Sequence, residues 1–143
     1  MPDGEMREIL VHGGPDETFD RAVMFARRMA ESFSARLHVL YTVAEPLSAG
    51  WTAEMSADRL PELHDAIVTE AHERLSALIP VEDQERLGVL FVVRTGPAAE
   101  ELVRYTTEEK VDLAIVQLRG GDDDSGPAHA LLEHGRCAVL ILR

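Results

Sequence analysis

The amino-acid sequence predicts an α/β domain in which helices cover both faces of a parallel β-sheet. Five short apolar runs alternate along the chain with four longer stretches of helical period, the order produced by parallel strands joined through helices. The short runs are apolar at nearly every position, which indicates strands buried on both faces. A chain of 143 residues is long enough for one such domain with its own core, so we expect a single domain over residues 1–143.

The first half of the chain carries two predicted strands and two predicted helices. Residues 8–12, with the sequence EILVH, form the first strand. Residues 17–33 place apolar side chains on one face and charged ones on the other, which predicts an amphipathic helix. Residues 35–43, ARLHVLYTV, form the second strand. A long amphipathic helix is predicted over residues 57–79, and Pro80 ends it.

The second half repeats this alternation with shorter helices. Residues 87–94, LGVLFVVR, form the third predicted strand. The helix predicted over 97–109 begins with a proline and has two glutamates in its first turn, both favourable there. The fourth strand is predicted over 111–117 and the fifth over 138–143. Between them, a proline and a glycine bound a short helix over 127–134.

The charge of the chain argues against nucleic-acid and membrane partners. Its 26 acidic and 14 basic residues give a net charge of −12, without a Lys and Arg cluster to neutralise phosphates. The same field repels anionic membrane surfaces, and no apolar run approaches the ~18–20 residues that span a bilayer. The first ten residues lack a signal-peptide pattern, and the single cysteine, Cys137, fits a reducing compartment. We therefore expect a cytoplasmic protein.

The predicted topology indicates where a ligand would bind. Open parallel sheets bind ligands at the carboxyl ends of their strands, where the strand order reverses. The segments that follow the five predicted strands are therefore candidate binding loops: residues 12–16, 42–51, 94–97 and 117–126, and the chain terminus after the fifth strand. His12 ends the first strand beside Gly13 and Gly14, which makes it a candidate hydrogen-bonding or catalytic side chain at this edge.

Two patterns imitate metal sites, and we expect neither to bind a metal. A calcium-type loop would begin at Asp122 and end at Glu133, but Pro127 occupies the position where such a loop needs glycine. A zinc helix of the form H-E-x-x-H begins at His72, but its second histidine is replaced by Ser76. A solvated acidic turn and an amphipathic helix explain these residues.

Three stretches, in their order and spacing, resemble the universal stress protein family across essentially the whole chain. "EILVHGGPDETFDRAVMFARRMAESFSARLHVLYTV" resembles the opening strand, helix and strand of that family. "VVRTGPAAEELVRYTTEEKVDLAIVQ" resembles its middle, and "GRCAVLILR" its ending. The resemblance implies a Rossmann-like, doubly wound (HUP-type) sheet of five strands in the order 3-2-1-4-5. It also implies a homodimer formed through the last strand, 138–143, whose apolar open edge favours pairing.

The positions that bind ATP in this family do not fit the present sequence. ATP-binding members usually carry an aspartate at the end of the first strand, facing the adenine, where this chain has His12. Their phosphate motif is G-x-x-G, nine residues, then G-(S/T). If Gly121 is the second glycine, the first falls on Leu118. If Gly120 is the second, the first falls on Gln117, and neither register reaches the final glycine.

The aspartates Asp122, Asp123 and Asp124 oppose a triphosphate at the same loop. Even at a dielectric constant of ~80, each unit charge ~4 Å from a phosphate costs about 1 kcal/mol of repulsion. A metal ion would reverse that sign, but the sequence offers no other ligand for one. We interpret the segment as a degenerate nucleotide-binding site and expect no cofactor.

Three functional hypotheses follow. The first is a stress-response or regulatory domain without enzymatic activity, which acts through protein contacts or another small ligand. The second is a sensor that binds AMP or ATP, with or without Mg²⁺, through an atypical phosphate loop in which Arg119 is the one cation placed for a phosphate. The third is an enzyme that uses His12 with a carboxylate such as Asp16, although the G-x-S-x-G elbow of a hydrolase is absent from the sequence.

Position on the predicted sheet and the family resemblance together give one set of candidate ligand-binding residues, none of them assigned a catalytic role. They are His12, Gly13, Gly14, Thr42, Val43, Gly96, Gln117, Arg119, Gly120 and Gly121.

Overall fold

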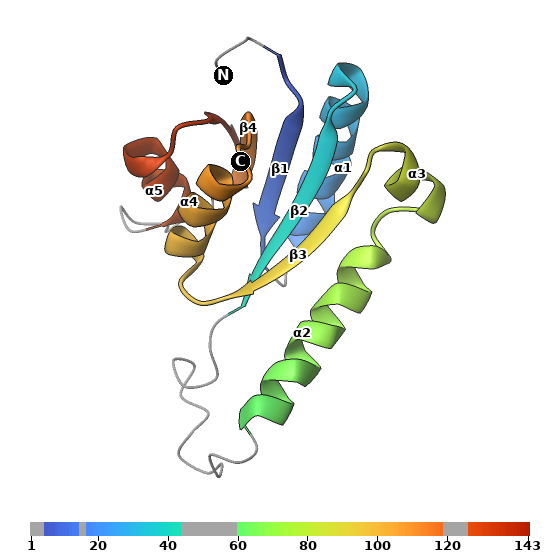
Figure 1. The fold of residues 1–143 in the computed structure, drawn as a ribbon, viewed down its shortest axis with the longest axis vertical. Coiled ribbons are helices and arrows are strands. Elements are labelled where there is room, and N and C mark those ends of the chain that lie inside the picture. The colour runs from blue at the N-terminus through green and yellow to red at the C-terminus, as the bar shows by residue number, and fades with distance from the viewer. Residues whose placement is uncertain (1–4, 15–16, 44–59, 119–125) are drawn as a thin grey trace.

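Five parallel strands form one sheet in the order β3-β2-β1-β4-β5 (Figure 1). The computed structural model describes residues 5–14, 17–43, 60–118 and 126–143. The strands are β1 (Glu8–Gly13), β2 (Arg36–Val43), β3 (Leu90–Thr95), β4 (Leu113–Gln117) and β5 (Ala138–Leu142). This order confirms the predicted doubly wound sheet, and its winding reverses between β1 and β4. The strands β1, β2 and β4 are almost wholly buried, whereas the edge strands β3 and β5 are half-exposed.

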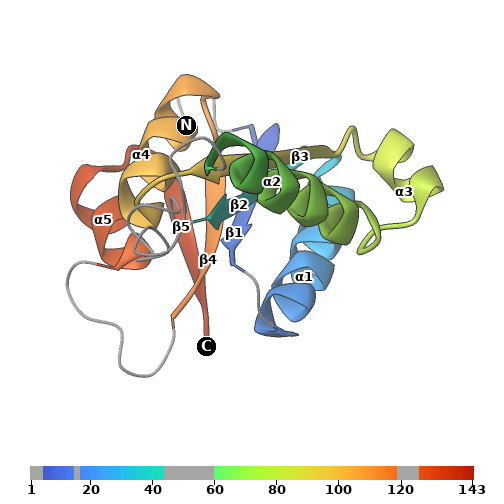
Figure 2. The same ribbon diagram turned by 90° about the horizontal axis from the view of Figure 1, so that it is seen from below.

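Helices cover both faces of the sheet, as the apolar strands predict. The helices are α1 (Glu17–Phe33), α2 (Leu60–Ser76), α3 (Val81–Arg86), α4 (Ala98–Glu108) and α5 (Pro127–His134). Figure 2 shows α1 and α2 on one side, with α3 beyond the end of α2, and α4 and α5 on the other. The bounds of α1 and α5 are those predicted from the sequence.

The short helix α3 is absent from the sequence prediction, which has a strand starting at residue 87. The preceding helix α2 ends at Ser76, three residues earlier than predicted, so Pro80 does not terminate it. Pro80 instead stands directly before α3, with extended backbone angles. The side-chain amide of Gln84 donates to the carbonyl oxygens of Ser76 and Ile79, at 3.0 and 2.8 Å. These bonds fold α3 back on the end of α2, so the third strand starts later, at Leu90.

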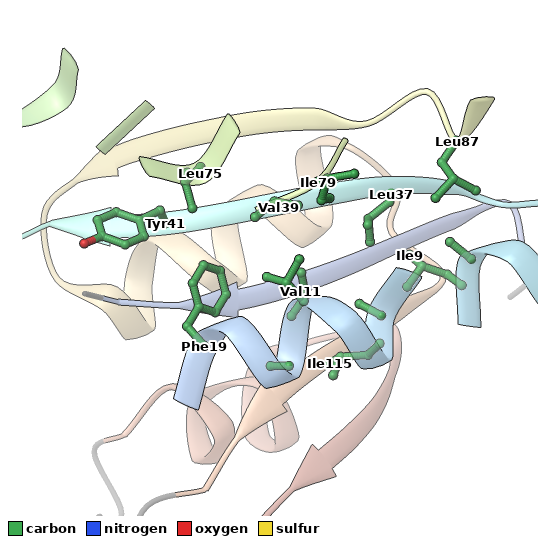
Figure 3. Close-up of a cluster of buried hydrophobic side chains, with 14 of the residues drawn as sticks. Ile9, Val11, Phe19, Leu37, Val39, Tyr41, Leu75, Ile79, Leu87 and Ile115 are labelled. Atoms are coloured by element: carbon green, nitrogen blue, oxygen red, sulfur yellow. The ribbon is translucent and has the colours of Figure 1, made fainter. Parts of the chain in front are cut away.

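The larger core lies between the sheet and the helices α1 and α2. Figure 3 shows Phe19 of α1 pointing toward Val11 and Tyr41 on the sheet, while Leu75 of α2 contacts the same layer. The rings of Phe19 and Tyr41 lie 6.1 Å apart between centroids, tilted by 53°. Burying each large apolar side chain of this kind contributes about 1.5–3 kcal/mol.

The core on the opposite face contains a polar chain of three residues. His38 is fully buried, and its two ring nitrogens lie 2.7 Å from the Tyr105 hydroxyl (Nδ1) and 2.7 Å from the Glu8 carboxylate (Nε2). Partial burial opposes ionisation of Glu8, but hydrogen bonds from Arg36 and His38 outweigh it, and the pKa of Glu8 is lowered. Because an ionised carboxylate only accepts, Nε2 must donate to it, and in the neutral ring Nδ1 then accepts from the tyrosine. Each group is thereby paired.

Candidate functional site

A pocket of about 230 Å³ opens at the carboxyl ends of β1, β2 and β4. This is the edge at which the winding of the sheet reverses, the usual ligand position in folds of this class. The lining residues come from three strand ends and from the starts of two helices. They are His12, Gly13, Gly14, Thr42, Ala98, Gln117 and Pro127.

His12 and Thr42 form the buried polar part of this pocket. Nε2 of His12 lies 2.9 Å from Oγ1 of Thr42, and the two residues are 7% and 9% exposed. The parallel register pairs His12 with Leu40, two residues before Thr42, so their side chains reach one another diagonally across the two strand ends. The family resemblance implies an aspartate, with a negative charge, at the end of the first strand in ATP-binding members. In this chain the His12–Thr42 pair presents hydrogen-bonding groups at this edge. The enzyme hypothesis built on His12 and Asp16 stays untested, since Asp16 lies outside the described residues.

Gly13 and Gly14 line the same pocket for different reasons. A Cβ added at Gly13 would lie 2.1 Å from Cδ2 of Phe19, so packing of α1 on β1 requires glycine there. A Cβ added at Gly14 would meet no atom within 4 Å. Gly13 is therefore explained by the core, while Gly14 leaves open space at the rim.

Val43 and Gly96 lie at the same edge without lining the pocket. The Gly96 N–H donates to the Val43 carbonyl oxygen at 3.0 Å, which joins the ends of β2 and β3. Gly96 has φ +139°, a value that side-chain-bearing residues rarely adopt, and the buried carboxylate of Glu101 lies beneath it. The structure gives Gly96 a backbone role beside the pocket.

Gln117 closes the wall of the pocket at the end of β4. Its side-chain Nε2 donates to the carbonyl oxygen of Thr18 at 2.7 Å, which fixes the orientation of the amide. Its Oε1 is buried and has no hydrogen-bond partner within the described part of the chain. The remaining predicted ligand residues, Arg119–Gly121, lie outside the described residues, as does the acidic turn that follows them.

Two lining residues, Ala98 and Pro127, are missing from the sequence-based set. They stand at the first positions of α4 and α5, so the positive ends of both helix dipoles lie at this pocket. Neither side chain carries chemistry, which is why residue types alone do not reveal them. The signal lies in the topology, because a helix that follows a parallel strand begins at its carboxyl end. Among the described lining residues there is no Lys or Arg.

A larger hollow, of about 640 Å³, lies at the opposite edge of the sheet. It is lined by side chains of both charges, among them Arg7, Glu8, Lys110 and Asp112. Asp112 is already engaged, since its Oδ2 accepts from the backbone N–H groups of Arg7 and Glu8 at 2.9 and 2.8 Å. The carboxyl edge remains the better candidate site because the helix N-termini and the strand reversal coincide there.

The described ranges contain no group of three or more His, Cys, Asp or Glu side chains that could hold a metal ion. No helix in those ranges is long and apolar enough to cross a membrane. Burial raises the pKa of the Cys137 thiol, which makes its reactive thiolate scarce at neutral pH.

Comparison with known proteins gives a family match over residues 6–143, to the universal stress protein family. The universal stress protein UspA from Lactobacillus plantarum is similar with a TM-score of 0.72 and 17% identity, over 98% of this chain and 99% of that one. A family protein from Burkholderia pseudomallei has a TM-score of 0.66 and 26% identity, over 96% of each chain. A universal stress protein solved in complex with cAMP has a TM-score of 0.63 and 19% identity, over 96% of each chain.

The search of curated proteins found no match. The family match nevertheless covers nearly the whole sequence, and the solved structures share the sheet order and helix layers described above. The chain belongs to the universal stress protein family.

Proposed function

We propose that this chain is a cytoplasmic regulatory domain without enzymatic activity. Its carboxyl-edge pocket does not bind ATP in the way usual for the family and binds another small ligand instead. The observation that carries the proposal is the composition of the pocket. His12, which is hydrogen-bonded to Thr42, ends the first strand, where the resemblance implies an adenine-facing aspartate in ATP-binding members of the family. No Lys or Arg lies among the described lining residues.

The volume of the pocket and the helix dipoles directed at it agree with this proposal. Its volume of about 230 Å³ is below the ~300–1,000 Å³ of most ligand pockets, so the described part suits a small molecule. The converging helix N-termini favour hydrogen-bond acceptors on the ligand. The His12–Thr42 pair adds a donor or acceptor according to the histidine tautomer.

An AMP- or ATP-binding sensor is the second candidate. The two helix N-termini at the pocket favour it, as does the relative solved in complex with cAMP. Arg119 would supply the cation for a phosphate in that case.

Calorimetric titration with ATP and with AMP, each with and without Mg²⁺, decides between the two candidates. We expect no heat of binding up to millimolar nucleotide. Micromolar binding that is lost in Arg119→Ala would establish the sensor and overturn our preferred function. Binding that survives Arg119→Ala would place the nucleotide on a different part of the pocket.

We also propose that the domain acts as a homodimer through β5. Among the strands that the structure describes, β5 pairs only with β4, and Ile141 is 39% exposed on it. An open apolar edge favours pairing with a second copy. Light scattering at micromolar concentration should give the mass of a dimer, and Ile141→Lys should shift it toward the monomer. A monomeric mass for the unmodified protein would contradict the proposal.

A further inference from the structure

A second hollow, of about 420 Å³, lies between α1 and the ends of β4 and β5. Figure 2 shows the first turn of α1 and the end of β5 at the same edge of the molecule. We call this hollow the α1–β5 groove. It shares only Gln117 with the carboxyl-edge pocket. Its lining residues are Thr18, Arg21, Ala22, Phe25, Gln117, Leu118, Leu142 and Arg143.

The groove exists because one face of β5 is incompletely covered. On the face that carries α4 and α5, α5 packs on β4 and β5. On the other face, α1 packs mainly on β1, β2 and β4. The apolar side chains beside β5 are therefore left partly open: Phe25 is 37% exposed and Leu118 is 42% exposed, with Leu142 half-buried between the strand and the α1 core. Adjacent exposed apolar side chains of this size are typical of a contact surface.

Two cationic side chains, Arg21 and Arg143, line this apolar surface. Within the described residues, neither Arg21 nor Arg143 forms an ion pair or a side-chain hydrogen bond, although acidic residues outnumber basic ones by 26 to 14. Several other arginines form ion pairs, such as Arg27 with Asp83 and Arg104 with Glu101. On a chain of net charge −12, two unpaired arginines on one apolar groove form a local site for an anion.

We propose that the α1–β5 groove binds an amphipathic carboxylate, a carboxyl group on an apolar body of the size of a medium-chain fatty acid or an aryl acid. A guanidinium presents its N–H groups in a fork that matches a carboxylate, so Arg21 and Arg143 hold the charged end. Phe25, Leu118 and Leu142 cover the apolar body. The volume of about 420 Å³ lies within the range of small-molecule pockets. This inference does not depend on the function proposed for the carboxyl-edge pocket.

Calorimetric titration with octanoate and with 1-octanol tests the proposal, because the two probes share a chain length and differ in charge. We expect octanoate to bind at least about tenfold more tightly than 1-octanol, the ratio that one charge-assisted hydrogen bond provides. Equal affinities, or no binding of octanoate up to millimolar concentration, would overturn the proposal. Binding of an acidic, leucine-containing peptide in the absence of octanoate binding would also overturn it, in favour of a protein-docking surface.

Substitutions locate the bound carboxylate. Arg21→Gln and Arg143→Gln should each weaken octanoate binding about tenfold and leave 1-octanol unaffected. Leu118→Ser should weaken the binding of both probes. Arg28→Gln is the matched control, since Arg28 is exposed on the same helix, outside the groove, and has no acidic partner in the described ranges. If Arg28→Gln weakens octanoate as much as Arg21→Gln does, only the general charge of the surface is involved and the site is wrong.

Discussion

Adding one methyl group at Gly13 should destabilise the protein, whereas adding one at Gly14 should not. A Cβ at Gly13 would lie 2.1 Å from Cδ2 of Phe19, and 2.7 Å from Cε2 and Cγ of the same ring. To reach an ordinary contact of 3.4 Å the ring must retreat by about 1.3 Å. It has little room to do so, since Phe19 is 2% exposed and packs against Tyr41. Overpacking of this kind costs about 1–3 kcal/mol.

The neighbouring glycine supplies the control. At Gly14 no atom lies within 4 Å of the added Cβ, and the backbone does not have a positive φ. Gly14→Ala should therefore be neutral or stabilise by up to about 1 kcal/mol, because alanine has fewer conformations to lose on folding. The two variants differ by one methyl group on adjacent residues, so the gap between them measures the contact with Phe19.

Urea unfolding monitored by circular dichroism gives both free energies of unfolding. We expect Gly13→Ala to be less stable than Gly14→Ala by about 1–4 kcal/mol, or about 2–4 °C in Tm for each kcal/mol. Replacing Phe19 by leucine in the Gly13→Ala background should recover part of the loss, as a double-mutant cycle would show. Equal stability of the two alanine variants would refute the reasoning, since the packing of α1 on β1 would then not require glycine at the strand end.

Two further predictions concern the polar contacts. Tyr105→Phe leaves Nδ1 of the buried His38 without its partner, so we expect a loss of about 1–3 kcal/mol in urea unfolding; an unchanged midpoint would show that another donor replaces the hydroxyl. The hydrogen bond from Arg86, together with the positive charge of Arg27, lowers the pKa of Asp83 below its usual 3.8. A carboxyl whose pKa is lowered by folding stabilises the protein above its unfolded pKa and loses that contribution as pH falls through the folded one. Asp83→Asn should therefore lower the Tm at pH 7, and the difference in Tm from the unmodified protein should begin to narrow as pH falls below about 3.8 and vanish only below the lowered folded pKa; a difference independent of pH would contradict the assigned ion pairs.

The fold was predictable because its signals are local. Apolar strands, helical periodicity and the proline and glycine at the helix ends give the order of the elements and the two layers, and the family resemblance adds the strand order. The helix α3 was not predictable in this way, because residues 81–86, VEDQER, have no apolar stripe. What holds it is tertiary: Gln84 binds the end of α2, and Asp83 pairs with Arg27 of α1.

The candidate site was predictable in outline and not in detail. Strand ends meet at one edge of a parallel sheet, so the sequence pattern alone is enough to group His12, Thr42 and Gln117. Their contacts do not follow from that pattern, because the His12–Thr42 bond joins residues 30 apart and depends on the register of β1 on β2. Ala98 and Pro127 carry no reactive group, and only the positions of α4 and α5 bring them to the pocket.

The buried chain of Glu8, His38 and Tyr105 also constrains how this sequence can change. Each of the three residues is hydrogen-bonded to the next, so substituting one of them leaves a polar atom in the core without its hydrogen-bond partner. Two compensating replacements, such as an apolar residue for the histidine together with phenylalanine for the tyrosine, avoid that penalty. Viable sequences should therefore cluster into two groups, one that keeps the whole chain of polar groups and one that has lost it. Intermediates between the two groups should be rare, so the three positions are expected to vary together among relatives.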